Sequence, residues 1–329
     1  MKLAPGELAR LAIELGARAE LDQKRDIQLA ASVFGRSARG RFLPSGEEVR
    51  NGDDAAAIRT GDGYVLVAAE GMRNEFVSAD PWFAGYSALM VNVSDIAAMG
   101  GSPWAVVDVL FLGGGHNERV LEGLRAASST FGVPIVGGHT TRVEGPTSLA
   151  VAIVGHARRL IESHTARAGE VLLAAIDLRG SFRGRSAFNA ATAAAPESLR
   201  AQLALLPELS EAGWIRAGKD ISNAGVCGTL AMLLESSGCG AQLDLGRLPA
   251  PERVDPLRWL TAFPSFGFLL SVEPADAERV CKRFEALGVS CQEVGVLTRG
   301  PGLTLTADGE SAPFGGDPRL SLTGFGACA

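Results

Sequence analysis

Short apolar runs of strand character alternate with longer stretches of helical character, and this alternation constrains the fold more than any other feature. The strand-like runs of the first half are AAAI (55–58), YVLVAA (64–69), WAVVDVLF (104–111), VPIV (133–136) and TSLAVAIVGHA (147–157). Between them, apolar periodicity predicts helices over about 83–100 and 117–131. Strands that alternate with helices indicate a layered α/β or α+β domain.

The pattern pauses at RRLIESHTARAGE (158–170), which is polar and lacks a strong period. It then starts again, with a strand predicted at VLLAAI (171–176) and helices at about 186–194, 197–213 and 224–236. Strands follow near 266–272 and 291–297, separated by the helix ADAERVCKRFEALG. We therefore interpret residues 158–170 as a linker between two domains.

The first 34 residues precede all of these strands, and from residue 5 onward they read as helix with a break near Gly16. The chain of 329 residues is too long for one ordinary core and long enough for two. We expect an N-terminal domain over residues 1–157 and a C-terminal domain over residues 158–329.

Composition and charge exclude several classes of function. Hydrophobic residues make up 47% of the chain and the net charge is −6, without any run rich in Lys or Arg. Such a protein has no electrostatic surface for nucleic acid. The longest apolar runs are too short to span a bilayer. The five cysteines include no CxxC pair and the N-terminus has no apolar signal core, so we expect reduced thiols in a cytoplasmic protein.

Two glycine-rich segments resemble nucleotide-binding loops, but each lacks a residue that its motif requires. GWIRAGKD (213–220) begins like a P-loop, but the position that should carry Ser or Thr for Mg²⁺ is Asp220. FLGGGHNE (111–118) lies where a dinucleotide fingerprint would, yet its last required glycine is Glu118. A nucleotide site in this chain must therefore use other chemistry.

Acidic residues stand near the ends of several predicted elements. Asp53 and Asp54 are adjacent in NGDDAAAI, where neighbouring carboxylates repel unless they are solvated or share a cation. Taken alone, this segment is also typical of an ordinary turn. Glu70 ends a strand, and Asp95 lies three residues after Asn92 on the mostly apolar helix VNVSDIAAMGG, so both side chains share one face.

Two further segments complete the set. IVGGHTTR ends a strand at Gly137 and Gly138, whose lack of side chains lets backbone amides approach a phosphate closely. KDISNAG places Asp220 and Asn223 at the start of a helix, where Ser222 or Asn223 could instead serve as a helix cap. Together these segments offer oxygen ligands of the kind that Mg²⁺ prefers while it keeps positions open for substrate phosphates. They predict nucleoside triphosphate chemistry outside the P-loop class.

The order of these motifs resembles one superfamily. GDDAA, an acidic residue and Gly after a strand, NVSDIAAMGGSP, GGHTTR and DIS follow one another as they do in the PurM-like superfamily. That superfamily contains aminoimidazole ribonucleotide (AIR) synthase, thiamine-monophosphate kinase, selenophosphate synthetase and the hydrogenase maturation carbamoyl dehydratase. The likeness covers nearly the whole chain and is greatest for its AIR synthase-related branch.

The resemblance implies a fold, a cofactor and a set of site residues. It implies two α/β domains, a homodimer whose N-terminal halves build a shared β-barrel, and ATP bound with several Mg²⁺ ions beside a small-molecule substrate. The metal ligands would be Asp53 or Asp54, Glu70, Asp95 and Asp220. The nucleotide would be lined by Asn92, Gly137, Gly138, His139, Thr140 and Lys24. On the helix VNVSDIAAMGG, Asn92 and Asp95 would face the nucleotide while Leu89, Val93 and Ile96 face the core.

The sequence also departs from the named members of the superfamily. Glu70 stands where relatives usually have Asp, His139 stands where the thiamine-monophosphate kinases have Asp, and Asn223 replaces a carboxylate. The N-terminal Cys or selenocysteine of selenophosphate synthetase is missing. Cys328 is penultimate, whereas the hydrogenase maturation proteins end in cysteine, so we interpret it as an incidental tail residue.

These features predict an ATP- and Mg²⁺-dependent enzyme of the kinase or synthetase type. It would transfer the γ-phosphoryl group of ATP to an oxygen of a small molecule, whose identity the sequence does not give. The alternative is a nucleotide-binding regulatory or maturation protein without turnover of its own. The substitutions at Glu70 and Asn223 motivate that alternative, and Cys328 would be essential only in a carbamoyl-type maturation enzyme.

Overall fold

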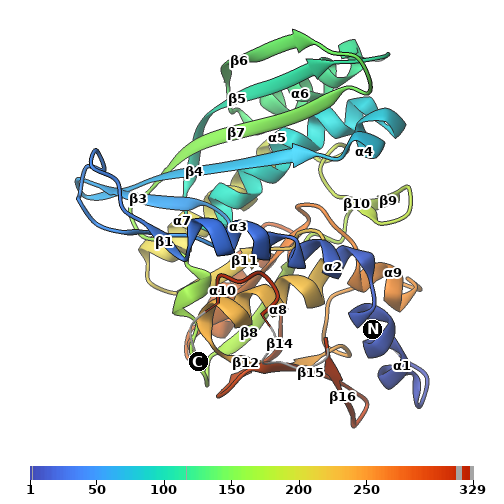
Figure 1. Cartoon of the computed structure of the whole chain (residues 1–329). Coiled ribbons are helices and arrows are strands. Elements are labelled where there is room, and N and C mark those ends of the chain that lie inside the picture. Colours follow the sequence, from blue (N-terminus) through green and yellow to red (C-terminus); the bar gives the residue numbers. More distant parts are fainter. Residues whose placement is uncertain (2, 116, 316–320, 327–329) are drawn as a thin grey trace.

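The computed structural model describes residues 1, 3–115, 117–315 and 321–326. Most of these residues belong to two halves, each built around one large β-sheet (Figure 1). The N-terminal sheet has the strand order β3-β4-β7-β5-β6. Its strands are β3 (Ala56–Thr60), β4 (Gly63–Met72), β5 (Ser102–Leu112), β6 (Ile135–Arg142) and β7 (Ser148–Ala157). This order makes β3 and β6 the two edge strands. β5 and β6 are parallel, and the other neighbouring strands are antiparallel.

Two helices cover one face of this sheet, α5 (Pro81–Ala98) and α6 (Asn117–Phe131), and a short helix α4 (Asn74–Ala79) precedes them. The two long helices approach closely at Gly85 and Gly123. A Cβ at Gly85 would lie 2.1 Å from the carbonyl oxygen of Val120, and one at Gly123 would lie 1.9 Å from that of Trp82. Only glycine fits such a crossing, which packs α5 firmly between α6 and the sheet.

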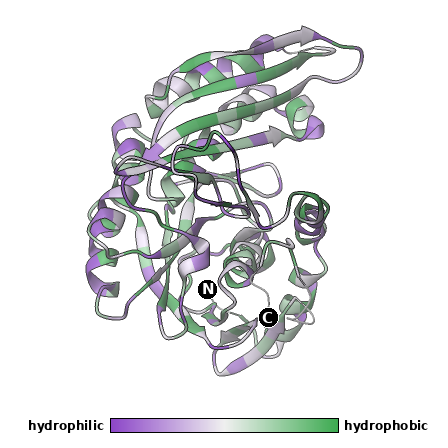
Figure 2. Cartoon of the chain, turned by 60° about the vertical axis from the view of Figure 1, so that its left-hand side comes forward, coloured by the Kyte–Doolittle hydropathy of each residue, from purple (hydrophilic) through white to green (hydrophobic). Residues whose placement is uncertain are grey.

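Among the residues that the structure describes, no helix covers the opposite face of the N-terminal sheet. Residues alternate along β7, so that Leu149, Val151 and Ile153 are buried beneath the helices while their neighbours are half-exposed. On the uncovered face, Val107 and Val109 of β5 are 40% and 37% exposed. Much of the central part of this sheet is green in Figure 2, the colour of hydrophobic residues.

The C-terminal sheet has the order β11-β13-β8-β14-β12-β15-β16. Its strands are β8 (Val171–Ile176), β11 (Ala217–Asp220), β12 (Gly240–Asp244), β13 (Gly267–Val272), β14 (Ser290–Thr298), β15 (Gly302–Ala307) and β16 (Glu310–Phe314). The helices of this half are α7 (Pro196–Glu211), α8 (Gly225–Ser237), α9 (Pro256–Leu260) and α10 (Ala277–Glu285). The turn η1 (Ser163–Thr165) lies in the predicted linker between the two sheets.

The N-terminal helices pack on the second half of the chain. The predicted helical stretch forms α1 (Glu7–Gly16), α2 (Ala19–Arg25) and α3 (Ile27–Phe34), which confirms the break near Gly16. Leu8, Leu15 and Leu21 are buried in the same apolar core as Trp259 of α9. The division at residue 157 does not anticipate this contact, which places α2 at the junction of the two sheets (Figure 1).

Most predicted elements are confirmed, and the helix expected over 186–194 is wrong. That segment instead contains the short strand β10 (Ala187–Asn189), which pairs in a hairpin with β9 (Ser181–Arg183) just before it. Phe188 is buried against Trp259 and Phe266, while the side chain of Asn189 accepts hydrogen bonds from the backbone N–H groups of Ala191 and Thr192. Such a local amide bond competes with helix formation. Among the described residues, no helix combines the length and the apolar character needed to span a bilayer.

Candidate metal and nucleotide site

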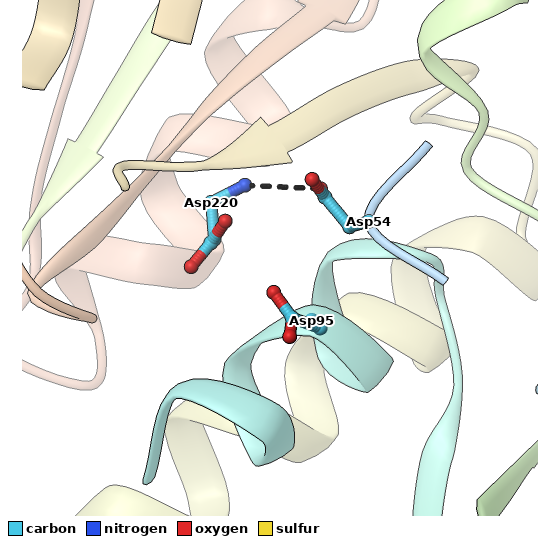
Figure 3. A group of neighbouring side chains, drawn as sticks. All are labelled: Asp54, Asp95 and Asp220. Atoms are coloured by element: carbon cyan, nitrogen blue, oxygen red, sulfur yellow. Dashed lines mark hydrogen bonds between the residues drawn. The ribbon is translucent and has the colours of Figure 1, made fainter. Parts of the chain in front are cut away.

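Three aspartates from distant parts of the chain converge at the junction of the two halves. Asp54 precedes β3, Asp95 lies on α5 and Asp220 ends β11, and an oxygen atom from each lies within 4.8 Å of the others. Figure 3 shows the three carboxylates turned toward one another. Asp95 and Asp220 are 7% and 3% exposed, and the backbone N–H of Asp220 donates to Asp54 Oδ2 at 3.4 Å. The structure thus brings together three of the five predicted metal ligands.

Burial disfavours the charged form of these three carboxyl groups when no cation is bound. Loss of solvent raises the pKa of Asp95 well above its ordinary value, and the neighbouring charges of Asp220, Glu70 and Asp54 raise it further. Burial, followed by the charge of Asp54, raises the pKa of Asp220 to about 7. Burial also raises the pKa of Asp54. The Oδ2 atom of Asp95 is buried without a hydrogen-bond partner.

This donor set fits a hard divalent cation. All of its ligand atoms are carboxylate oxygens, which Mg²⁺ and similar ions prefer over nitrogen or sulfur. The unpartnered oxygen of Asp95 and the mutual repulsion of the three groups are both satisfied by one cation placed among them. The arrangement therefore offers the oxygen donors and the negative charge that a hard divalent cation requires.

Asp53 points away from these three carboxylates although it is adjacent to Asp54. Its Oδ2 accepts a hydrogen bond from the backbone N–H of Ser163 at 2.8 Å and lies 3.8 Å from Nε2 of His164. Its Oδ1 lies 3.5 Å from the Nζ atom of Lys219. Of the two adjacent aspartates, Asp54 is thus the one placed with the other candidate ligands.

Lys219 is the functional-site residue that the sequence analysis did not identify. Its side chain is 6% exposed, and its ammonium group donates to Asp54 Oδ1 while it contacts Asp53. Burial alone would lower the pKa of Lys219, but the charges of Asp54 and Asp53 outweigh burial and raise it. A signal was present in the sequence, because a lysine that precedes Asp220 between apolar segments has few partners except carboxylates.

Lys24 and Glu70 reach the same region from two other elements. Lys24 of α2 donates to the hydroxyl of Ser222 at 3.4 Å, and burial lowers its pKa although the charge of Glu70 opposes this effect. Glu70 of β4 is exposed to solvent and lies outside the group of three close carboxylates. Although part of its side chain remains exposed, the protein atoms around its carboxyl group raise its pKa, and the charge of Lys24 opposes that shift.

Asn92 is buried within the N-terminal half rather than turned toward the aspartates. It is 0% exposed, and its amide nitrogen donates to the carbonyl oxygens of Ala88 at 2.8 Å and Val151 at 3.2 Å. The amide thereby ties α5 to β7. A nucleotide contact through Asn92 would require this packing to open, so its side chain serves here to position the helix that carries Asp95.

The GGHTTR segment lies at the far edge of the N-terminal sheet. The strand expected to end at Gly137 instead continues through it, because β6 pairs with β5 from Gly137 to Arg142 after a register shift at Val136. A Cβ at Gly138 would lie 2.6 Å from Oδ1 of Asp108, so the neighbouring side chain occupies the space that glycine leaves. The ring of His139 lies 6.4 Å from that of Phe111, and Thr140 is exposed.

The strand register gives the separation between Glu70 and this edge. Glu70, Val151, Asp108 and Gly138 form one row across β4, β7, β5 and β6. Three strand spacings of about 4.8 Å put Glu70 and Gly138 roughly 14 Å apart. Gly137, Gly138, His139 and Thr140 therefore lie at the sheet edge opposite β3, three strands away from Glu70.

The DISNAG segment forms no side-chain helix cap. α8 begins at Gly225 after Ala224, and no side chain caps it. Asn223 instead donates to Oε1 of Gln23 on α2, and the backbone N–H of Ser222 donates to the hydroxyl of Thr229. These bonds fix the turn after Asp220 against the N-terminal helices.

The fold and the site together define a class: two α/β halves joined at a buried group of carboxylates that both halves supply. Residues 52–157 match the N-terminal domain of the family described as AIR synthase related protein, and residues 162–308 match its C-terminal domain. The chain belongs to this family, within the PurM-like superfamily that the motifs indicated.

Relatives and solved structures agree with this assignment. The chain is 43% identical to the uncharacterized protein sll0787 of Synechocystis sp. over 97% of this chain and 98% of that protein. The structure of AaThiL complexed with AMPPCP and TMP matches with a TM-score of 0.63 at 19% identity, over 79% of this chain and 88% of its own. T. maritima PurL complexed with ADP matches with a TM-score of 0.71 at 18% identity, over 93% of this chain and 53% of its own. At these identities the two structures establish the fold alone.

Proposed function

We propose that this protein binds ATP together with Mg²⁺ at the junction of its two halves and transfers the γ-phosphoryl group to a small molecule. The observation that carries the proposal is the convergence of Asp54, Asp95 and Asp220, which are supplied by both halves of the chain. Bound Mg²⁺ would neutralise charge on the triphosphate. Family membership supports the nucleotide, since AaThiL is complexed with AMPPCP and T. maritima PurL with ADP.

The residues of this chain would act mainly by binding and orienting the phosphates. Asp54, Asp95 and Asp220 would hold the cation, and the ammonium group of Lys24 would contact a phosphate oxygen beside Glu70. Phosphoryl transfer requires little else from a protein than alignment and charge compensation. The product is either a phosphate ester or an activated intermediate that a nitrogen nucleophile attacks.

Titration calorimetry with AMPPCP tests the binding step. We expect AMPPCP to bind in the presence of MgCl₂ and to lose at least tenfold in affinity in EDTA, because the aspartates repel phosphates unless a cation lies between them. Asp220→Asn should weaken binding in MgCl₂, whereas Asp308→Asn, in the exposed turn between β15 and β16, should not. A folded protein that binds AMPPCP equally well with and without Mg²⁺ would refute the proposal.

Turnover is tested separately by ADP formation with a panel of small alcohols, carboxylates and amides. Acceptor-dependent ADP formation supports an enzyme. The second candidate function is nucleotide binding without turnover, and two observations favour it. Glu70 lies outside the group of close carboxylates, and the side chain of Asn223 is bound to Gln23. Tight AMPPCP binding without ADP formation from ATP, with or without acceptors, would select this second function.

A carbamoyl-type maturation activity would depend on Cys328, which lies outside the described residues. This activity predicts that Cys328→Ser abolishes function in cells that need the protein. An active Cys328→Ser variant would remove maturation from consideration and would leave the phosphoryl-transfer proposal untouched.

We propose that the uncovered face of the N-terminal sheet is the surface of a homodimer. Val107, Val109 and Phe111 lie exposed on β5, and β6 is an edge strand with unpaired backbone groups. An apolar sheet face beside a free edge is a surface that proteins rarely leave open to water. A second copy of the same sheet is a complementary cover, because isologous pairing buries the same patch on both copies.

A further inference from the structure

Lys219 occupies an unusual position for a lysine. It lies in β11, all four residues of which are buried, and β11 is antiparallel to β13, with Lys219 opposite Leu269. Its ammonium group lies between the two adjacent aspartates, bonded to Asp54 and 3.5 Å from Asp53. Burial of an ammonium ion is unfavourable unless carboxylates surround it, and here Asp53 and Asp54 provide that compensation.

The oxygens of Asp53 are all engaged with other groups. Oδ1 faces Lys219, while Oδ2 accepts from the Ser163 N–H and lies near His164. Asp54 divides its two oxygens, because Oδ1 bonds Lys219 and Oδ2 accepts from the backbone N–H of Asp220. Two adjacent carboxylates therefore share one protein cation, where a pair without the lysine would need a metal ion.

We propose that the Lys219 ammonium group takes the place of one divalent cation, so that the site binds a single metal ion among Asp54, Asp95 and Asp220. Asp53 lies outside the group that Asp54 forms with Asp95 and Asp220, so it is then a partner of Lys219 and not a metal ligand. The inference rests on the proposed function, because it assumes that these three aspartates bind Mg²⁺. It goes further because it states how many metal ions the protein binds and proposes that Lys219 sets this number.

Counting Mn²⁺ ions tests the inference without nucleotide. Mn²⁺ alone is titrated into the protein and free Mn²⁺ is measured by electron paramagnetic resonance, with wild type, Lys219→Met and Asp95→Asn compared. We expect one tightly bound ion in wild type, two in Lys219→Met and a loss of at least tenfold in affinity in Asp95→Asn. Lys282→Met is the matched control, because Lys282 pairs with Glu278 on the surface of α10, and it should bind one ion.

The outcomes separate this inference from the proposed function. One ion in both wild type and Lys219→Met, in folded samples, overturns the role of Lys219 and leaves the metal site intact. No ion in wild type, or affinity unchanged by Asp95→Asn, overturns the proposed metal site and the inference with it. If Lys219→Met does not fold, the wild-type count decides, because two tight ions that are both lost in Asp54→Asn would also overturn the inference.

Discussion

Asp95→Asn is the substitution whose effect depends most directly on the proposed electrostatics of the site. Asn has nearly the same shape as Asp, so the change removes a charge and leaves the packing of α5 in place. The oxygens of Asp54, Asp95 and Asp220 lie within 4.8 Å of one another. At an effective dielectric constant of about 20, two unit charges at that distance repel by roughly 3 kcal/mol.

This repulsion gives the expected magnitude and sign. Protons held by the cluster relieve part of it, because burial raises the pKa of each of the three carboxyl groups. We therefore expect Asp95→Asn to raise the free energy of unfolding by about 1–3 kcal/mol at pH 8 in EDTA. In MgCl₂ part of this gain in the free energy of unfolding should be lost. The variant lacks one ligand and should bind the ion about tenfold or more weakly, which is ~1.4 kcal/mol.

Urea unfolding at pH 8, in EDTA and in MgCl₂, measures both effects. Asp177→Asn is the control, because Asp177 is buried and forms two hydrogen bonds with the guanidinium group of Arg179. That variant should be destabilised equally with and without Mg²⁺. Suppose that Asp95→Asn is less stable than wild type in EDTA and that Mg²⁺ raises the free energy of unfolding of both proteins equally. The three carboxylates then do not form a metal site.

Three further predictions concern pH, packing and assembly. The pKa of Asp220 is raised to about 7 in the folded protein, so the folded state binds a proton more tightly than the unfolded state. This contribution to stability is lost as pH rises through 7, and the free energy of unfolding in EDTA should therefore fall from pH 5.5 to 8. MgCl₂ should stabilise more at pH 8 than at pH 5.5, and equal effects would contradict this. Gly123→Ala should cost about 1–3 kcal/mol in urea unfolding, because the new Cβ meets the carbonyl of Trp82, and a neutral change would refute the close crossing. Val109→Lys should convert a dimer to a monomer in light scattering at unchanged fold, whereas Val296→Lys on the other sheet should not.

The helices and the longer strands could be predicted from the sequence because their apolar periods are strong. The helix over 117–131 and the strand over 171–176 have the predicted bounds. The segment 186–194 could not be predicted, since its alanines favour a helix while the buried ring of Phe188 and the local bonds of Asn189 favour a hairpin. Tertiary packing decides such short segments over intrinsic propensity.

The candidate site could be predicted in its chemistry and only partly in its geometry. The sequence indicated Asp53 or Asp54 together with Glu70, Asp95 and Asp220, and the structure brings Asp54, Asp95 and Asp220 together. The position of Asn92 depended on what covers the helix, because α5 is buried on nearly every side and the shared face that includes Asp95 also packs on β7. Spacing along a helix predicts a common face and does not reveal what that face contacts.

The packing of the N-terminal helices explains why the site needs both halves of the chain. Leu21 holds α2 in the core of the C-terminal half, so Lys24 approaches the aspartates from the same side as Lys219 and Asp220. Asp54 and Asp95 approach from the other half. A cation among the three aspartates would consequently tie the two halves together across a junction that otherwise depends on Lys219 for its charge balance. The distance between the halves should therefore respond to metal binding, which links occupation of the site to the alignment of Lys24 with a bound phosphate.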